Sequence, residues 1–276
     1  MKGDYQAMNL KIIEWNINQR ASNKCIPPFI FDELITQDPD IIVLTEFNNK
    51  SANSEQFLKK FKKLGYSYVK TNNDFDQNQI VILIKENITI NNSISYKSKK
   101  NNDIPNLILV DCVFNNTAFS ILGVRIRIGK GDKGDYECRK EQMNFILTEI
   151  KEISNPLIMI GDFNNLRSNT TEKTWNLSVL DDLLDKKNLK RHTPNNKHSW
   201  GVKYNLYKNE LDGYISNDHL ATSSSIIINH IDYDWSFIDE KNKYQIEDEV
   251  DMYNQKKVFI PVGLPDHAIL KSSVTI

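Results

Sequence analysis

The sequence predicts a domain of the α/β or α+β class, and two features of the chain support this. Short apolar runs rich in Ile, Val and Leu recur along the 276 residues, as expected of β-strands. Between them lie about four stretches in which apolar residues recur at helical spacing. With 39% hydrophobic residues and no internal repeat or low-complexity linker, the chain is expected to form one large domain.

The first half of the chain is expected to be mostly β-strand. Strands are predicted at 10–17, 41–44, 66–70, 79–85, 88–94, 106–114 and 118–128, and helices at 27–35 and 55–64. Pro39 ends the first helix, because the residue before a proline disfavours helical backbone. Asn115 and Asn116 form a turn signal, so the strands on either side of them are expected to pair as a hairpin.

The second half is expected to alternate helices and strands. Helices are predicted at 136–153 and 177–189, and strands at 157–160, from 198 onward, at 211–216, at 224–228 and at 269–276. Residues 1–8 are expected to be a leader outside the fold, which would then span 9–276. The segment 229–262 is acidic and contains six aromatic residues, so we interpret it as an insertion that is not simply disordered.

Composition restricts the class of protein. The three cysteines, Cys25, Cys112 and Cys138, are odd in number and widely spaced, which fits unpaired thiols in a reducing compartment. The formal net charge of -1 gives no general affinity for nucleic acid, although a local basic groove is compatible with it. Neither a signal peptide nor an apolar run of about 20 residues is present, so we expect a cytoplasmic protein without a membrane span.

The stretch PLIMIGDFNN (156–165) is the most informative part of the sequence. Its apolar residues 157–160 fit a strand buried on both faces, and Gly161 ends that strand. Asp162 and Asn164 follow two residues apart, so in extended backbone both side chains would point to the same side. An ordinary turn is the alternative interpretation, because Gly, Asp and Asn are common turn residues.

Similar polar residues stand at the ends of other predicted strands. These residues are Asn16, Glu46, Asp212, Asp266 and His267. In layered sheet folds such strand ends gather along one edge, where converging carboxylates repel one another unless they share a cation or a proton. Oxygen ligands without cysteine favour Mg²⁺ or Mn²⁺ over a structural zinc ion. Taken singly, each of these residues also fits a turn cap or a surface carboxylate.

The ordered motifs resemble those of the endonuclease/exonuclease/phosphatase superfamily, which has the fold of deoxyribonuclease I and of exonuclease III-type apurinic endonucleases. They are WNIN (15–18), the acid of LTEF (44–47), GDFN (161–164), the segment 200–216 that ends in LDGYIS, and PDHAIL (265–270). Each motif alone is a weak signal, but five in the right order are specific. The resemblance implies a four-layer sandwich in which two packed mixed β-sheets are flanked by helices.

The resemblance also implies roles for individual residues. Glu46 and Asp266 would hold the metal, Mg²⁺ or alternatively Mn²⁺, with Asn16 beside it. Asp162 would deprotonate the attacking water, and Asn164 would donate a hydrogen bond to a phosphoryl oxygen. His267 would hold or protonate the phosphate, and Asp212 would orient its ring.

Two departures from the family pattern are visible. Many nucleases of the family have a histidine where this chain has Arg125, and Arg127 follows two residues later. A guanidinium group binds phosphate but cannot act as a general acid, so we expect these two arginines to bind substrate. Pro265 replaces the usual serine before Asp266, a change that leaves the predicted ligands intact.

The motifs indicate the bond that is attacked better than the molecule that carries it. The leading hypothesis is a Mg²⁺-dependent phosphodiesterase acting on nucleic acid, with DNA favoured over RNA, because cationic residues cluster around 125–139. They are Arg125, Arg127, Lys130, Lys133 and Arg139. The near-neutral net charge and the acidic segment favour a phosphatase or phosphodiesterase of a small or lipid phosphate instead. A non-catalytic binding module on the same fold is the third alternative.

Overall fold

The computed structural model describes residues 9–18, 25–71, 79–96, 105–128, 134–165, 175–195, 198–205, 210–238, 248–250, 259–261 and 265–276. The expected leader at 1–8 lies outside these residues, as do Lys130 and Lys133. Within the described part, no helix combines the length and the apolar character that crossing a membrane requires.

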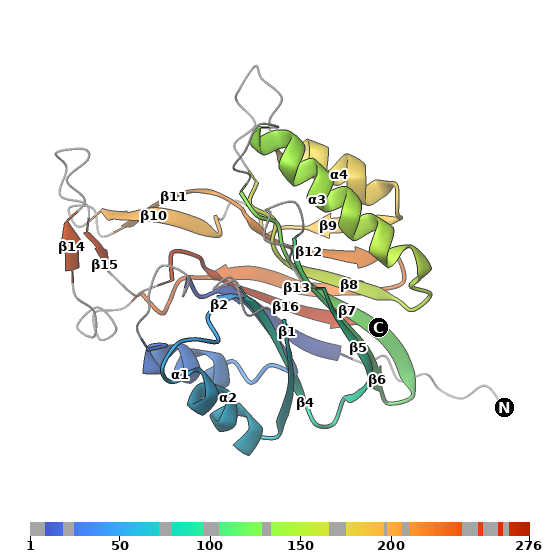
Figure 1. The fold of residues 1–276 in the computed structure, drawn as a ribbon, viewed down its shortest axis with the longest axis horizontal. Coiled ribbons are helices and arrows are strands. Elements are labelled where there is room, and N and C mark those ends of the chain that lie inside the picture. The colour runs from blue at the N-terminus through green and yellow to red at the C-terminus, as the bar shows by residue number, and fades with distance from the viewer. Residues whose placement is uncertain are drawn as a thin grey trace.

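Two six-stranded sheets form the centre of the molecule (Figure 1). The first has the order β13 (Ile227–Asp234), β16 (Ile269–Thr275), β1 (Asn9–Asn16), β2 (Ile41–Phe47), β4 (Gln79–Lys85) and β3 (Tyr66–Lys70). The second has the order β5 (Thr89–Tyr96), β6 (Asn106–Phe114), β7 (Thr117–Arg125), β8 (Leu157–Asp162), β12 (Asp218–Ser223) and β9 (Leu189–His192). Both sheets are mixed, because β1 and β2 are parallel and so are β7 and β8.

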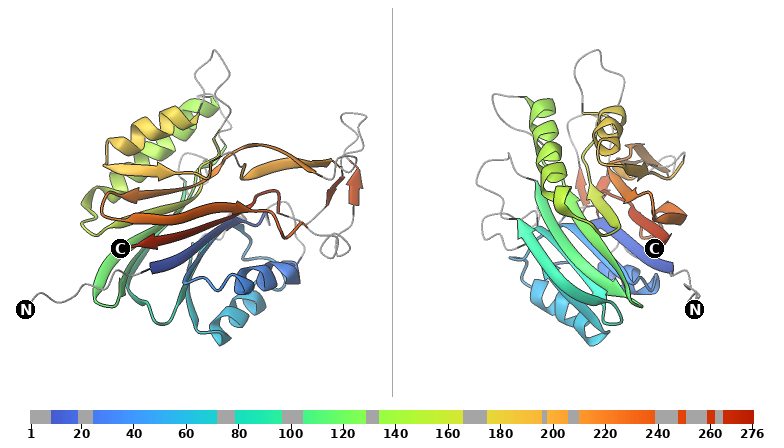
Figure 2. Two further views of the ribbon diagram at one scale, coloured as in Figure 1. Left: turned by 180° about the vertical axis from the view of Figure 1, so that it is seen from behind. Right: turned by 90° about the vertical axis from the view of Figure 1, so that its right-hand side faces the viewer.

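Apolar side chains hold the layers together. One buried cluster, which includes Ile12, Ile82 and Ile121, fills the space between the sheets. The first sheet packs its other face under α1 (Pro28–Thr36) and α2 (Ser54–Lys63), and the second packs its other face under α3 (Asp135–Glu149) and α4 (Leu177–Asp185). The 3-10 turn Ile150–Glu152 follows α3. Figure 2 shows the resulting order of helices, sheet, sheet and helices, which confirms the predicted four-layer sandwich.

The turn at Asn115 and Asn116 has the predicted hairpin geometry. Both residues have positive φ, 47° and 67°, which asparagine tolerates better than most residues and which matches the twist of the flanking strands. Strands β6 and β7 pair along their whole length on either side of this turn. The predicted hairpin is therefore confirmed.

The C-terminal third differs from the sequence-based prediction in several strands. Strand β12 was not predicted, and the strand expected at 224–228 begins only at Ile227 and runs to Asp234. Residues 229–234 of the expected insertion form most of the edge strand β13, and Phe237 is buried under the first sheet, so this part of the segment is integrated into the sandwich. The remaining strands β10 (Trp200–Asn205), β11 (Glu210–Ile215), β14 (Asp248–Val250) and β15 (Phe259–Pro261) form a separate four-stranded sheet.

Candidate active site

The strand ends that carry the predicted site residues meet at one edge of the sandwich. In the first sheet, Asn16 pairs in register with Thr45, the neighbour of Glu46. In the second sheet, Asp162 pairs with Arg125 of the parallel strand β7 and with Asp218 of the antiparallel strand β12. Parallel strands end at the same edge of a sheet, so residues more than a hundred positions apart are brought together by topology.

Gly161 allows strand β8 to approach strand β7 closely just before Asp162. Its φ is 152°, and a Cβ atom at this position would lie 1.9 Å from the carbonyl oxygen of Val124 on the neighbouring strand β7. Only glycine avoids this clash. The glycine of GDFN is thus required by strand packing next to the site.

Asp162 is fully buried and held by two amides. Asn16 Nδ2 donates to Asp162 Oδ2 at 3.0 Å, and Asn164 Nδ2 donates to the same oxygen at 2.8 Å. The backbone N–H of Asn164 donates to Asp162 Oδ1 at 2.9 Å. Burial raises the pKa of Asp162 to about 6, although the nearby His267 opposes this rise. At neutral pH the carboxylate is mostly ionised, as a general base requires.

Asn164 positions Asp162 in this structure. Its Nδ2 donates to Ile126 O at 2.7 Å as well as to Asp162 Oδ2, so both of its amide hydrogens are engaged within the protein. Its backbone is left-handed, with φ 49°, a conformation that asparagine tolerates well. Donation from Asn164 to a phosphoryl oxygen, as the resemblance implies, would require one of these hydrogen bonds to be exchanged.

Glu46 stands in a strained backbone conformation. Its φ is 51°, which is unusual for a glutamate, and the pairing of β2 with β4 shifts register between Leu44 and Phe47. Such a bulge turns a side chain away from the regular alternation of the strand, and strained residues cluster at functional sites. The Glu46 carboxylate accepts hydrogen bonds from Arg125 Nε at 3.1 Å and from Arg125 Nη2.

Glu46 and Asp266 line the same hollow and influence each other. Burial raises the pKa of Asp266, and the Glu46 carboxylate contributes to the rise while His267 opposes it. Asp266 Oδ2 also accepts a hydrogen bond from Trp200 Nε1 at 3.1 Å. Among the described residues, no three His, Cys, Asp or Glu side chains form a complete metal cage. Two carboxylates on an open hollow fit Mg²⁺, which keeps several water ligands.

The partner of His267 is Asp218 rather than the predicted Asp212. His267 Nδ1 lies 2.8 Å from Asp218 Oδ2, and both side chains are buried. Asp212 lies in β11, of which only the backbone is described. Two segments, LDGYIS and NDHLATS, each carry an aspartate in a strand. Only the second segment forms a strand that pairs with β8, and the local sequence pattern does not contain this fact of sheet topology.

Acidic neighbours favour the charged form of the His267 ring. Burial alone would lower the pKa of His267, but the charge and hydrogen bond of Asp218, with the charges of Asp266 and Asp162, raise it well above its usual value. A protonated ring can donate a hydrogen bond or a proton. Ser199 Oγ fixes the start of β12 by accepting the backbone N–H of Asp218 at 3.0 Å.

Glu14 is a further buried acid that the sequence analysis did not single out. It is fully buried, its Oε1 accepts a hydrogen bond from Thr45 Oγ1 at 3.0 Å, and its Oε2 has no hydrogen-bond partner among the described residues. Burial raises its pKa well above the usual value, and Asp218 and Asp162 raise it further. The sequence feature that could have indicated Glu14 is an acidic residue in the middle of the apolar strand LKIIEWNI (10–17).

The two arginines expected to bind substrate are buried in this structure. Arg125 is 2% exposed and contacts Glu46, whereas Arg127 Nη2 donates to Asn106 Oδ1 at 2.6 Å. The Arg127 backbone N–H also donates to Gln142 Oε1 at 2.8 Å. These contacts of Arg125 and Arg127 are with protein groups, and the expectation that the two arginines bind substrate stays a prediction.

The site opens onto a hollow of about 180 Å³. Among its lining residues are Glu46, Asn164, Asp266 and His267, with Arg139 as the lining cation. Arg139 is itself buried, pairs with Asp135 at 2.7 Å and donates to the backbone carbonyl of Asn164.

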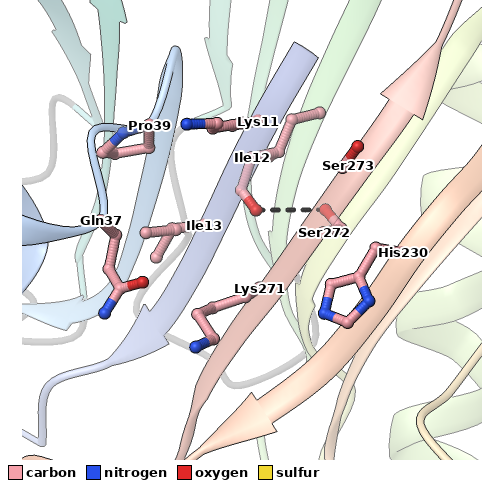
Figure 3. A pocket seen from close by; sticks show the side chains of 9 residues that line it. All are labelled: Lys11, Ile12, Ile13, Gln37, Pro39, His230, Lys271, Ser272 and Ser273. Atoms are coloured by element: carbon pink, nitrogen blue, oxygen red, sulfur yellow. Dashed lines mark hydrogen bonds between the residues drawn. The ribbon is translucent and has the colours of Figure 1, made fainter. Parts of the chain in front are cut away.

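A second hollow, of about 290 Å³, lies across β1, β16 and β13 (Figure 3). It contains Lys11, Lys271 and His230 but no acidic residue, and the Lys271 ammonium is paired with Asp234 at 2.8 Å. It includes none of the predicted site residues, although it is the larger of the two. The candidate active site is therefore the smaller hollow at the strand ends.

The chain has the fold of the endonuclease/exonuclease/phosphatase superfamily, which confirms the resemblance at the level of the fold. A protein of this family from Bacteroides thetaiotaomicron matches with a TM-score of 0.62 and 15% identity, covering 99% of both chains. A mannosyl-6-phosphatase from the same organism matches at 0.63 and 14%, covering 97% of this chain and all of the other. D. rerio TDP2 complexed with a single-strand DNA product matches at 0.61 and 14%, covering 97% and 99%. No family model and no curated protein matches the chain.

Proposed function

We propose that this protein is a divalent-metal-dependent hydrolase of phosphoester bonds. The observation that carries the proposal is a pair of buried groups at one edge of the sandwich. His267, held by Asp218, lines the hollow, and Asp162 is hydrogen-bonded to Asn16 and to Asn164, which also lines the hollow. A base of pKa about 6 beside a protonated imidazole is the arrangement that general acid-base catalysis at neutral pH requires.

Glu46 and Asp266 would hold the Mg²⁺ or Mn²⁺ ion that the resemblance implies. When bound, such an ion supplies positive charge that offsets the negative charge developing on the phosphoryl oxygens. Asp162 would orient the attacking water and accept its proton, since its own orientation is fixed by three hydrogen bonds. The charged His267 ring would donate to the phosphoryl group, and Asp218 would keep its Nε2 directed at the hollow.

Nucleic acid is the first candidate substrate, as the sequence motifs lead us to expect. The fold is similar to that of TDP2, which has been seen with a single-strand DNA product. A phosphodiester contains a P–O bond that a water molecule activated by Asp162 would attack. Metal-assisted in-line attack of that water would break one P–O bond of DNA or RNA and leave a terminal phosphate on one fragment and a hydroxyl on the other.

A small phosphoester is the second candidate, and two observations favour it. The hollow is compact, at about 180 Å³, and the described cations nearest to it are buried and paired with acidic or amide groups. The fold is also similar to that of a mannosyl-6-phosphatase. A site of this kind would accept a single phosphoryl group rather than a long stretch of duplex.

A cleavage panel tests the proposal and separates the candidates. Purified protein would be incubated with plasmid DNA, single-stranded DNA, abasic DNA, RNA and a set of sugar and nucleotide phosphates, with Mg²⁺ or with EDTA. We expect EDTA-sensitive hydrolysis of one class, lost in Asp162→Asn. Hydrolysis of metabolites without nuclease activity selects the small-phosphoester reading. No hydrolysis of any substrate would contradict the proposal and favour a binding module.

A further inference from the structure

Arg125 is a cation built into the carboxylate cluster of the site. It ends β7, where its backbone pairs with Asp162, and its side chain crosses to the first sheet to reach Glu46. Its Nε lies 3.1 Å from Glu46 Oε1 and 3.7 Å from Asp162 Oδ2. One guanidinium therefore lies between the expected metal ligand and the expected base.

The burial of Arg125 makes this charge effective. The side chain is 2% exposed, and Glu46 and Asp162 are buried with it, so water screens the three charges little. A guanidinium stays protonated at any ordinary pH, so the positive charge is permanent. Arg125 thus compensates both carboxylates before any other cation enters the site.

Substrate contact does not explain these observations. Arg125 is absent from the described residues that line the hollow, and its Nε and Nη2 donate to Glu46. A phosphate in the hollow would therefore meet Glu46 and Asp266 before it met this guanidinium. The position of Arg125 points instead to the cation that Glu46 is expected to hold.

We propose that Arg125 is the resident counter-ion of the metal site: it holds Glu46 in place before a divalent ion binds, and it weakens the binding of that ion. The weakening has two sources, because the ion must share the Glu46 carboxylate with the guanidinium and must approach a fixed positive charge. The inference rests on the proposed function, since it requires Glu46 to be a metal ligand.

Mn²⁺ binding and thermal stability test this inference without any measurement of turnover. Arg125→Gln removes the charge but keeps an amide N–H that can reach Glu46. We expect the Kd for Mn²⁺, measured by calorimetry or electron paramagnetic resonance, to fall about tenfold or more. The Tm of the metal-free variant should fall below that of the unsubstituted protein, and saturating Mn²⁺ should raise the variant's Tm by the larger amount.

Arg127→Gln is the matched control. It also removes a buried guanidinium from the same segment, but one whose Nη2 donates to Asn106 Oδ1. Its Kd for Mn²⁺ should stay within about twofold of the unsubstituted protein, since this guanidinium is held by an amide. Glu46→Gln should abolish binding and so locate the ion.

Four outcomes divide the possibilities. Tighter Mn²⁺ binding in Arg125→Gln alone supports the inference. Unchanged or weaker binding overturns it, even if the Tm falls, because the role would then be structural. If Arg125→Gln fails to fold, Arg125→Lys replaces it, because lysine keeps the positive charge in another geometry. An increased or unchanged Kd for Mn²⁺ in Arg125→Lys supports the inference, and a decreased Kd overturns it. If the unsubstituted protein binds no Mn²⁺, the proposed function itself fails and this inference with it.

Discussion

Two histidines near the start of β12, on opposite faces of the second sheet, show how neighbouring residues change the pKa of a buried group. His219 of β12 and His267, which contacts Asp218 of that strand, are both buried, yet the pKa of His267 is raised well above its usual value and that of His219 is lowered well below it. His267 faces the carboxylates of Asp218, Asp266 and Asp162. His219 is desolvated with the positive charge of Arg191 nearby, which lowers its pKa further.

The alternation of β12 separates the two environments. Asp218 and His219 are consecutive, so their side chains point to opposite faces of the second sheet. On the face toward the first sheet, acids gather around the hollow. On the other face, His219 Nδ1 lies 2.8 Å from Thr193 Oγ1 and Nε2 lies 3.2 Å from Asn165 Nδ2. We infer that the first face performs chemistry and that the second supports it.

The largest effect is expected from Asp162→Asn, on the chemical face. The amide has nearly the same shape but cannot accept a proton from water, so kcat should fall by about 100-fold or more. Steady-state kinetics on the substrate found in the panel would measure this, with circular dichroism to show that the fold is retained. Activity close to that of the unsubstituted protein would remove Asp162 from the mechanism.

Asp218→Asn should have the next largest effect. Loss of the carboxylate charge lowers the pKa of His267, because Asp218 supplies both a charge and a hydrogen bond to the ring. We expect kcat to fall by about tenfold to 100-fold and the alkaline limb of the pH profile to move to lower pH. Nuclear magnetic resonance titration of the ring would give the pKa directly. An unchanged His267 pKa would contradict the pairing.

The pH dependence of kcat/KM follows from the same two groups. Asp162 must be ionised to act as a base, so the rate should rise as pH increases through about 6. His267 must be protonated to donate, so the rate should fall as pH rises through its raised pKa, above the usual value of a histidine. Below the lower pKa the rate should change about tenfold per pH unit. A flat profile from pH 5 to 7 would exclude Asp162 as the base.

His219→Gln, on the supporting face, should have the smallest effect on the rate. Glutamine keeps polar groups near Thr193 and Asn165, so kcat should change by less than about threefold. Stability should fall by about 1–3 kcal/mol, because buried hydrogen bonds are lost or rearranged. Chemical denaturation would measure the loss. A rate loss as large as that of Asp162→Asn would contradict the inference that only the face toward the first sheet performs chemistry.

Local sequence patterns were sufficient for most of the helices and strands, whereas the four-layer arrangement was expected only from the family resemblance. Strand β8 was predicted because its residues are apolar without interruption, and helix α4 because its leucines recur at helical spacing. Strand β12 was missed because DHLATS begins with two polar residues and has a weak alternation. Its place in the sheet depends on pairing with β8 and β9, far away in the sequence.

The site was predictable where a motif carries its own geometry. Asp162 and Asn164 are two residues apart and their side chains are hydrogen-bonded, although Asn164 has a left-handed backbone rather than the extended backbone on which the prediction was based. Asp218 and Glu14 were missed because their importance comes from partners on other strands. The contact of Arg125 with Glu46 joins residues 79 positions apart, and the residue types alone suggested phosphate instead.

The left-handed backbone of Glu46 has a consequence for related sequences. At φ 51° a glutamate has a less favourable backbone conformation than glycine or asparagine would have. Replacing Glu46 by either residue would therefore relieve backbone strain while removing the carboxylate. Selection for hydrolysis and selection for a relaxed backbone therefore oppose each other at this one position. In a relative freed from the need to hydrolyse, position 46 is where drift toward glycine should be seen early.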